Sequence, residues 1–255
     1  LAEYKASLTQ EEKETLVRQT EELKRYQEEP TPAEDLKCIP LLNREDIGKK
    51  AQPFQNEQRQ FDDVPVLFHD IFTNGIQYVR LAFDVKDLKE YAPYLSLLAE
   101  LISAVDTERY DKLELGNEIF LHSGGISTDV GVYADRHSDD YRMFWELNAK
   151  VLYSEIGEVL KLLMEILTTS KVGDEKRLRE VIGEVRSTKQ SALQASGHQT
   201  AVLRAMSYQR ESSYINEHIR GIAYYDFLCD LEEHFEERKD SLISILKALM
   251  KKVFV

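Results

Sequence analysis

The sequence predicts an α+β fold, in which an antiparallel sheet packs against several helices and a helical hairpin arm precedes this domain. Residues 64–85 contain two strand-like runs that meet at an Asn-Gly turn, and two further apolar-alternating runs cover residues 126–134 and 142–151. Helical periodicity then continues from residue 154 to the end of the chain. Strands that come first and helices that follow favour an α+β architecture over a regular alternation of the two.

The charged arm occupies residues 1–45, and the α+β domain occupies residues 46–255. Thr9-Gln10-Glu11-Glu12 is a capping box that starts a helix. The apolar stripe of this helix is thin and consists of Leu16, Leu23 and Tyr26. Pro30 ends the helix, and we expect Thr31 to be the N-cap of a short second helix with Pro32 at its first position. Such an arm cannot bury much apolar surface by itself.

The Asn74-Gly75 pair is the strongest local signal in the chain. A type I′ turn needs positive φ at both central residues, which Gly adopts freely and Asn tolerates. We therefore expect a hairpin in which the apolar residues from Val64 to Phe72 share one face with those from Val79 to Val85. In this register His69 lies opposite Arg80 on the other face.

The remaining elements follow from apolar spacing and turn residues. His137-Ser138-Asp139-Asp140 is the expected turn between the last two strands. The expected helices cover residues 88–104, 110–121, 174–196, 199–208, 212–237 and 241–254, and another contains Leu160, Leu163 and Leu167.

Composition excludes two classes of partner. The net charge of −13 argues against non-specific nucleic-acid binding, because a phosphate backbone requires a concentrated Lys/Arg surface. No apolar run approaches the ~20 residues that span a bilayer, so we expect no membrane partner. Cys38 and Cys229 form no metal-ligand spacing and indicate free thiols in a reducing compartment, which we take to be the cytoplasm. The chain lacks an initial methionine and a signal peptide, and it is typical of a fragment of a longer protein.

The nearest approach to a metal motif is His234-Phe235-Glu236-Glu237-Arg238. The inverted zinc motif H-x-x-E-H places two imidazoles on one helix face beside a general base. Here Arg238 occupies the position of the second histidine, and a guanidinium cannot ligate zinc. We therefore interpret this stretch as a solvated acidic helix face on which His234 and Glu237 form an exposed pair.

Other candidate residues carry no clear chemistry. The five remaining histidines have no His or Cys at ligand spacing: His69, His122, His137, His198 and His218. Ser123-Gly124-Gly125 and Ser196-Gly197-His198 lack the nucleophile elbow and the phosphate-binding glycine patterns, and His198 or Ser196 is expected to cap a helix. Four tyrosines are interpreted as a packing cluster: Tyr208, Tyr214, Tyr224 and Tyr225.

The order of the pieces nevertheless resembles a known family. The motifs are Tyr4-Lys5-Ala6-Ser7-Leu8-Thr9, Thr31-Pro32-Ala33-Glu34-Asp35-Leu36, Ile39-Pro40-Leu41, Val64-Pro65-Val66-Leu67-Phe68-His69, Thr73-Asn74-Gly75-Ile76, Ala92-Pro93-Tyr94-Leu95, Ser123-Gly124-Gly125-Ile126, Ser196-Gly197-His198 and Arg204-Ala205. In this order they are similar to the associated region of presequence-protease-type enzymes in the insulinase/pitrilysin family of metallopeptidases. The similarity covers essentially the whole chain.

This resemblance implies an insulinase/mitochondrial-processing-peptidase-like domain within a zinc peptidase of four homologous domains that close around a peptide-sized chamber. The chain would supply the linker and the third domain, while the zinc ligands lie in the first domain and carbonyl-supporting residues in the last. No catalytic, cofactor-binding or metal-binding residue is therefore predicted here. The expected partners are the remaining domains of the same polypeptide and the peptide substrates of the parent enzyme.

Three functions remain open at this point. The first is a non-catalytic linker and chamber-wall part of a zinc metalloendopeptidase that degrades unfolded peptides, with residues 3–39 as a hinge. The second is a stand-alone acidic helical protein-interaction module. The third, an independent metal enzyme built on His234 and Glu237, needs a further His or Cys that the spacing does not supply. Whether the chain is itself an enzyme stays open, although alone it is expected to be inactive.

Overall fold

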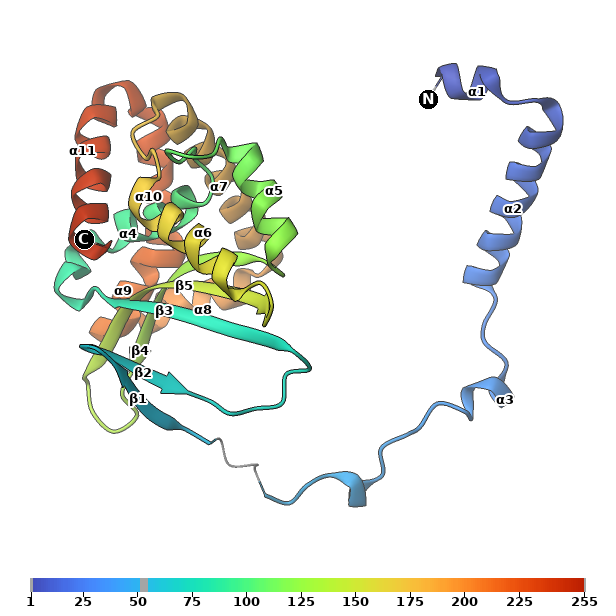
Figure 1. Ribbon diagram of the computed structural model, residues 1–255, viewed down its shortest axis with the longest axis horizontal. Helices are drawn as coiled ribbons and strands as arrows, with labels where there is room; N and C mark the ends of the chain where they lie inside the picture. The colour runs from blue at the N-terminus through green and yellow to red at the C-terminus, as the bar shows by residue number, and fades with distance from the viewer. Residues whose placement is uncertain (1, 51–54, 255) are drawn as a thin grey trace. The chain divides into compact units, whose positions relative to one another are not determined.

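The computed structural model describes residues 2–50 and 55–254 (Figure 1). The chain divides into two compact units, an N-terminal unit of residues 1–71 and a C-terminal unit of residues 72–255. The predicted linker, residues 1–45, lies within the N-terminal unit. The assignment of residues 46–255 to the third domain of a peptidase stays a prediction.

The N-terminal unit consists of short elements. These are α1 (Ala2–Ser7), α2 (Gln10–Glu28), α3 (Ala33–Leu36), the 3-10 helix η1 (Arg44–Asp46), β1 (Glu57–Phe61) and β2 (Val64–Phe68). The capping box is confirmed, because Glu12 N donates to Thr9 Oγ1 at 3.2 Å and Thr9 N donates to Glu12 Oε2 at 2.7 Å. Thr31 is not the N-cap of α3: Pro32 holds that place with extended backbone angles, so the first helical residue is Ala33.

The expected hairpin across residues 64–85 is wrong. β2 pairs with β1 in antiparallel register, from Phe61 opposite Val64 to Glu57 opposite Phe68. The tight turn that joins them contains Asp62, whose φ is +50°. This connection is shorter than the one through Asn74-Gly75, and the polar β1 sequence carries no apolar alternation by which it could be identified as a strand.

Asn74-Gly75 still forms the expected local turn. Both residues have positive φ, +52° and +83°, and Ile76 N donates to Thr73 O at 3.2 Å. The chain then enters β3 (Ile76–Asp84), which pairs with β5 (Tyr141–Leu152). Arg80 consequently lies opposite Asn148, and the expected pairing of Arg80 with His69 is also wrong.

The sheet of the C-terminal unit has the strand order β3-β5-β4, with β5 in the centre and all pairings antiparallel. β4 (Ile126–Ala134) and β5 confirm the two strands predicted from alternation. Their register runs from Ile126 opposite Ala149 to Ala134 opposite Tyr141. Every second residue of β5 is buried against the helices, and Trp145 and Leu147 are completely inaccessible.

Nine helical segments belong to the described part of this unit. They are the 3-10 helix η2 (Lys86–Tyr91), α4 (Ala92–Ile102), α5 (Lys112–His122), α6 (Ile156–Thr169), α7 (Glu175–Ala195), α8 (Gly197–Met206), α9 (Glu211–Arg220), α10 (Ile222–Glu233) and α11 (Phe235–Phe254). In Figure 1, α4, α6, α7, α10 and α11 lie on one side of the sheet. Among the residues that the structure describes, no helix is both long and apolar enough to cross a membrane.

The single helix expected over residues 212–237 is three helices. Gly221 has extended backbone angles and separates α9 from α10, and His234 leaves the helical region and separates α10 from α11. The last helix therefore begins at Phe235 rather than at residue 241. Apolar periodicity continues through both breaks because all three helices contribute to one core, so the pattern could not indicate where they end.

Candidate functional site

The incomplete zinc motif lies at the junction of α10 and α11. His234 Nδ1 is 3.2 Å from Asp230 Oδ1, so the imidazole contacts a carboxylate one turn earlier in α10. The expected pair of His234 with Glu237 is replaced by this contact. Arg238 forms an ion pair with the same Asp230, and its Nη2 lies 3.5 Å from the Tyr94 hydroxyl.

This donor set does not fit zinc. One imidazole and one guanidinium converge on a single carboxylate, and the fixed positive charge of Arg238 stands where a second ligand would be required. Within residues 2–50 and 55–254, no three His, Cys, Asp or Glu side chains are grouped so that they could hold a metal ion.

The other histidines lie on separate elements or turns. His122, at the end of α5, is 2.9 Å from Glu155 Oε2 and 3.6 Å from Glu118 Oε2. The hydrogen bond with Glu155 raises the pKa of His122 above its ordinary value. His218 Nδ1 lies 2.8 Å from the Tyr214 carbonyl. His198 lies in the first turn of α8, but Ser196 makes no side-chain cap there.

The four tyrosines do not form one packing cluster. Tyr224 is completely buried, and burial raises the pKa of its phenol strongly. Tyr208 and Tyr214, by contrast, are 77% and 54% exposed. The prediction of a shared core role is therefore wrong for these two residues, because α8 and α9 turn them toward solvent.

The functional surface that the fold does build is the side of the sheet opposite the buried face of β5. We call it the open face. It comprises Tyr78, Arg80, Ala82 and Asp84 of β3, Ser127, Asp129, Gly131 and Tyr133 of β4, and Arg142, Phe144, Glu146, Asn148 and Lys150 of β5. Most of these side chains are exposed or half-buried, and Tyr78 is 62% exposed.

A hydrogen-bond network links all three strands across the open face. The Tyr133 hydroxyl donates to Glu146 Oε1 at 2.7 Å, and Arg80 Nη1 lies 3.8 Å from the same oxygen. Arg80 Nε also donates to Asn148 Oδ1 at 2.8 Å. Glu146 is only 6% exposed although it belongs to this face, because the Tyr133 and Arg80 side chains lie beside it. A carboxylate at such a depth needs these partners to offset its lost hydration.

Gly131 allows Tyr133 to reach Glu146. A Cβ atom at residue 131 would lie 2.6 Å from Tyr133 Cε2, so any larger residue would displace the ring. Burial and the hydrogen bond to Glu146 raise the pKa of Tyr133 above its ordinary value. The phenol therefore stays protonated and continues to donate to the carboxylate at neutral and mildly alkaline pH.

The outer edge of β4 is tied to the helical layer. Arg220, at the end of α9, donates from Nη2 to the Val130 carbonyl at 2.5 Å and lies 3.6 Å from Asp129 Oδ2. A side chain thus satisfies an edge carbonyl that would otherwise be open to another strand. This contact fixes one border of the open face.

Sequence reasoning recognised that Glu146, Asn148 and Lys150 alternate with core residues but did not identify their network. One available signal was Gly131 inside an alternating strand, since such a glycine often marks a close approach. The pairing of Arg80 with Asn148 could not be found, because the incorrect hairpin gave β3 a different neighbour. Chemically, the open face offers fixed donors and acceptors that suit the polar backbone of a polypeptide.

Comparison with known proteins places the chain. The family that matches residues 1–231 is described as peptidase-associated, for peptidases of metallopeptidase family 16, subfamily C. The chain belongs to this family. It is 32% identical over 256 residues to Protein HypA of Clostridium perfringens (strain 13 / Type A), covering 100% of this chain and 26% of that protein. This membership confirms the resemblance to presequence-protease-type enzymes.

Two presequence proteases show similar relationships to this peptidase-associated chain. Presequence protease 1, chloroplastic/mitochondrial, of Arabidopsis thaliana is 30% identical over 250 residues, which are 98% of this chain and 23% of that protein. Presequence protease, mitochondrial, of Saccharomyces cerevisiae is 30% identical over 234 residues, which are 88% of this chain and 23% of that protein. The chain thus spans about a quarter of the length of these relatives. A solved structure of a conserved protein from Enterococcus faecalis V583 aligns with a TM-score of 0.46 and 13% identity over 68% of this chain and 40% of that one.

Proposed function

We propose that this chain is a helical linker and part of the chamber wall of a zinc-dependent metalloendopeptidase that degrades unfolded peptides. The observation that carries the proposal is the match of nearly the whole chain to one quarter of proteins named presequence proteases, within a family described as peptidase-associated. The zinc and its ligands would then belong to other domains of the same polypeptide. The role of this chain would be to shape the space in which peptides are held.

The open face supports the role of a wall. Extended peptides carry a repeating series of amide donors and carbonyl acceptors, and the open face presents Arg80, Asn148 and Tyr78 as partially exposed hydrogen-bonding groups. The Tyr133–Glu146 contact beneath them holds the three strands in one arrangement. A wall with fixed polar groups can hold peptides of many sequences, because backbone groups are common to all of them.

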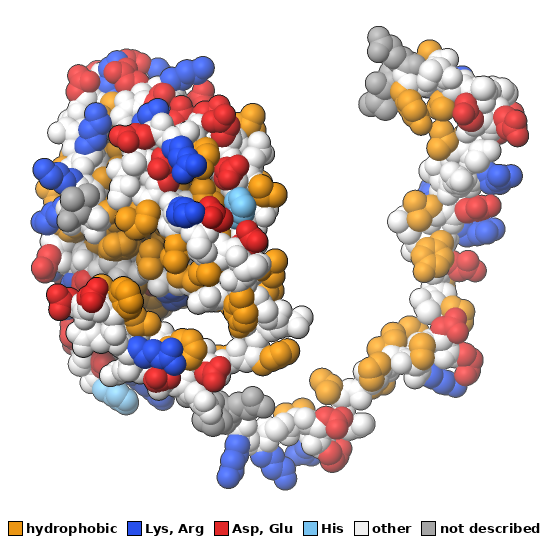
Figure 2. Space-filling model, in the orientation of Figure 1, with side chains coloured by type: hydrophobic (Ala, Val, Ile, Leu, Met, Phe, Trp, Pro, Cys, Tyr) orange, Lys and Arg blue, Asp and Glu red, His pale blue; other side chains and the backbone are white. Residues whose placement is uncertain are grey.

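The N-terminal unit supports the role of a linker. α2 has no buried residue, and the apolar side chains of Leu16, Leu23 and Tyr26 are exposed. Figure 2 shows apolar side chains along this unit with charged groups between them. A helix with an exposed apolar stripe can pack against a neighbouring domain and change its position at small cost, as a hinge requires.

We further propose that the remaining domains of the same polypeptide are its partners and that the protein works in the cytoplasm. The free thiols of Cys38 and Cys229 suit a reducing compartment. Cell fractionation with an antibody against this chain tests the compartment. Recovery of the protein in an organelle or outside the cell would contradict it.

The wall is tested by photo-crosslinking in the full-length polypeptide. A benzoylphenylalanine at Tyr78 of the open face should couple to an unfolded peptide, whereas the same group at Lys176, on the exposed side of α7, should not. Coupling at neither position, or equally at both, would contradict the wall.

The division of labour is tested by metal analysis and peptide cleavage. The full-length polypeptide should cleave unfolded peptides in a chelator-sensitive reaction. This chain alone should retain no stoichiometric zinc after dialysis and should cleave nothing. Chelator-sensitive cleavage by this chain alone would favour an independent enzyme. No cleavage by the full-length protein, together with binding of an unrelated partner to the arm, would favour a stand-alone interaction module.

A further inference from the structure

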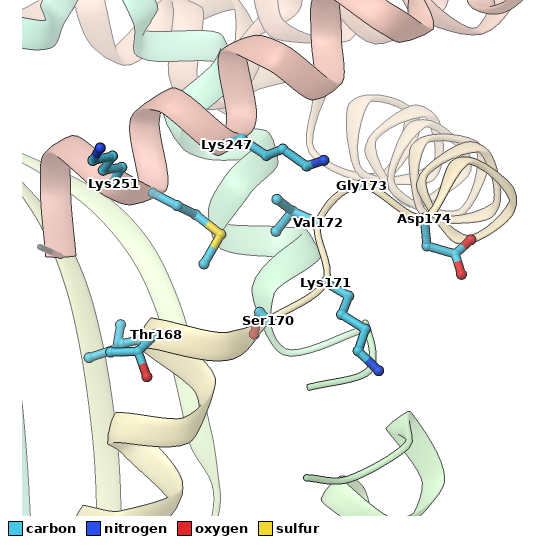
Figure 3. A pocket seen from close by; sticks show the side chains of 10 residues that line it. Thr168, Ser170, Lys171, Val172, Gly173, Asp174, Lys247 and Lys251 are labelled. Atoms are coloured by element: carbon cyan, nitrogen blue, oxygen red, sulfur yellow. The ribbon is translucent and has the colours of Figure 1, made fainter. Parts of the chain in front are cut away.

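A cavity of about 560 Å³ lies between the end of α6, the segment that leads into α7, and the last turns of α11 (Figure 3). It lies entirely within the C-terminal unit and away from the open face, since its walls belong to the helical layer. The lining residues are Leu167, Thr168, Ser170, Lys171, Val172, Gly173, Asp174, Lys247, Met250 and Lys251. None of them belongs to the network described above.

The floor of the cavity is apolar. Leu167 and Val172 are nearly inaccessible to solvent, and Met250 packs against the core from α11. The one hydroxyl near the floor is already used, because Ser170 Oγ donates toward the carbonyls of Ile102 and Ile166 at 3.0 and 2.7 Å. The floor therefore suits an apolar side chain, and a methionine wall adapts readily to its shape.

The rim of the cavity is basic. Lys171, Lys247 and Lys251 are exposed, and none of the ion pairs formed among the described residues involves them. In a chain whose net charge is −13, three such lysines around one cavity are unusual. The acidic lining residue Asp174 does not neutralise them, because its carboxylate accepts from Arg177 N at 2.8 Å as the N-cap of α7. The rim therefore favours a negatively charged occupant.

Lys247 is placed by the segment opposite it. In Figure 3 its side chain extends from α11 toward Gly173, while Lys171 and Lys251 point in other directions. A Cβ atom at residue 173 would lie 2.8 Å from Lys247 Cε, so the glycine allows the lysine stem to cross the cavity edge. The three ammonium groups thus stand at separate points of the rim and can meet carboxylates on a chain segment rather than on a single small ion.

We propose that this cavity binds an acidic amphipathic segment from the part of the polypeptide outside this chain. An apolar side chain of that segment would occupy the floor formed by Leu167, Val172 and Met250, and flanking Asp or Glu residues would pair with the rim lysines. The inference rests on the proposed function in one respect, namely that this chain is one part of a longer polypeptide, as in relatives about four times its length. The occupant follows from charge complementarity and from the apolar floor.

The first test is zero-length carbodiimide coupling in the full-length polypeptide, followed by mass spectrometry. Lys171, Lys247 or Lys251 should couple to Asp or Glu residues outside residues 1–255, whereas the exposed Lys176 of α7 should not. Couplings that join two copies of the polypeptide, distinguished by isotopic labelling, would overturn the proposal. So would couplings only within this chain, or none.

The second test compares Met250→Glu with Ala248→Glu in the full-length polypeptide. Both substitutions add one carboxylate to α11, but only Met250 lines the cavity, and Ala248 is exposed. Amide exchange across residues 168–174 should be at least tenfold slower in the full-length protein than in this chain alone. Met250→Glu should abolish that difference, and Ala248→Glu should preserve it.

Two measurements keep these results interpretable. If Met250→Glu also unfolds this chain, as its melting transition would reveal, the variant Lys171→Gln/Lys247→Gln replaces it, because both residues are exposed. Equal protection in every variant, or none in the full-length protein, would overturn the proposal. Peptide cleavage is a separate readout: its absence would contradict the proposed function while leaving the cavity occupied, and normal cleavage with an empty cavity would contradict only the inference.

Discussion

The N-terminal and C-terminal units differ in what holds them together. In the C-terminal unit, alternate residues of β5 are buried beneath five helices, and Trp145 contacts the rings of Phe83 and Phe254. In the N-terminal unit, none of the described residues is buried, and α2 is fixed mainly by its own hydrogen bonds and by the Thr9–Glu12 capping box. The comparison teaches that regular secondary structure and tertiary stability are separate properties of this chain.

The physical reason lies in cooperativity. An isolated helix of the length of α2 is marginal in water, and a two-stranded hairpin such as β1–β2 is marginal as well. Burial of apolar side chains contributes about 1.5–3 kcal/mol for each large residue, and only the C-terminal unit has such residues in its interior. The N-terminal unit should therefore gain most of its order from whatever it packs against.

The largest expected effect contrasts one core residue with one arm residue. Trp145→Ala should lower the free energy of unfolding by about 3–5 kcal/mol, because it leaves a large cavity under the helices. Leu23→Ala, in the exposed stripe of α2, should change it by less than about 0.5 kcal/mol. Urea denaturation monitored by circular dichroism measures both. A comparable loss from Leu23→Ala would show that the N-terminal unit shares the core after all.

A smaller effect is expected at the junction of α9 and α10. A Cβ at residue 221 would collide with the Glu217 carboxylate, which is buried and accepts from Ala223 N at 3.2 Å. Gly221→Ala should therefore destabilise the C-terminal unit by about 2–3 kcal/mol. Combining it with Glu217→Ala should cost less than the sum of the two single changes. Additive losses in denaturant midpoints would exclude this collision as the cause.

The turn at Asn74-Gly75 should contribute less. Gly75 has φ +83° and open space around it, so Gly75→Val should cost about 1–2 kcal/mol through backbone strain alone. Gly116→Ala is the matched control, since it lies in α5 with no close neighbour and should stabilise the protein by about 0.5–1 kcal/mol. An unchanged denaturant midpoint for Gly75→Val would mean that this turn is not formed in solution.

The smallest effect depends on pH. Because contact with Glu155 raises the pKa of His122, the folded state binds this proton more tightly than the unfolded state. The resulting stability is fully present below the unfolded pKa of ~6.5 and is lost as pH rises through the higher folded value. His122→Asn should thus destabilise the protein more near pH 5 than near pH 9. The same change at exposed His137 is the control, and an equal pH profile for both variants would contradict the assignment.

The fold was predictable where local signals are strong and unambiguous. The capping box at Thr9, the alternation in β4 and β5, and the N-cap Asp174 of α7 all correspond to the observed elements. Strand partners were less accessible, because β1 is a polar strand and its pairing with β2 depends on a short turn rather than on an apolar pattern. The breaks at Gly221 and His234 are tertiary in origin and left apolar periodicity intact.

Much less of the candidate site could be predicted. The substitution of Arg238 for a zinc ligand is visible in the sequence, and the structure adds that Asp230 occupies both neighbouring side chains. The open-face network joins residues from three strands that are far apart in sequence. Its recognition required the register of β3 against β5, which places Arg80 beside Asn148.

Hydrogen exchange of this chain tests the contrast between the two units most directly. Backbone amides of residues 11–27 in α2 should exchange much faster than those of residues 143–151 in β5, because no core protects the arm helix. The difference should shrink in a longer polypeptide that restores the neighbours of the arm. If α2 in this chain alone is already as protected as the strand that contains Trp145, the arm is an integral part of the domain and its role as a hinge is contradicted.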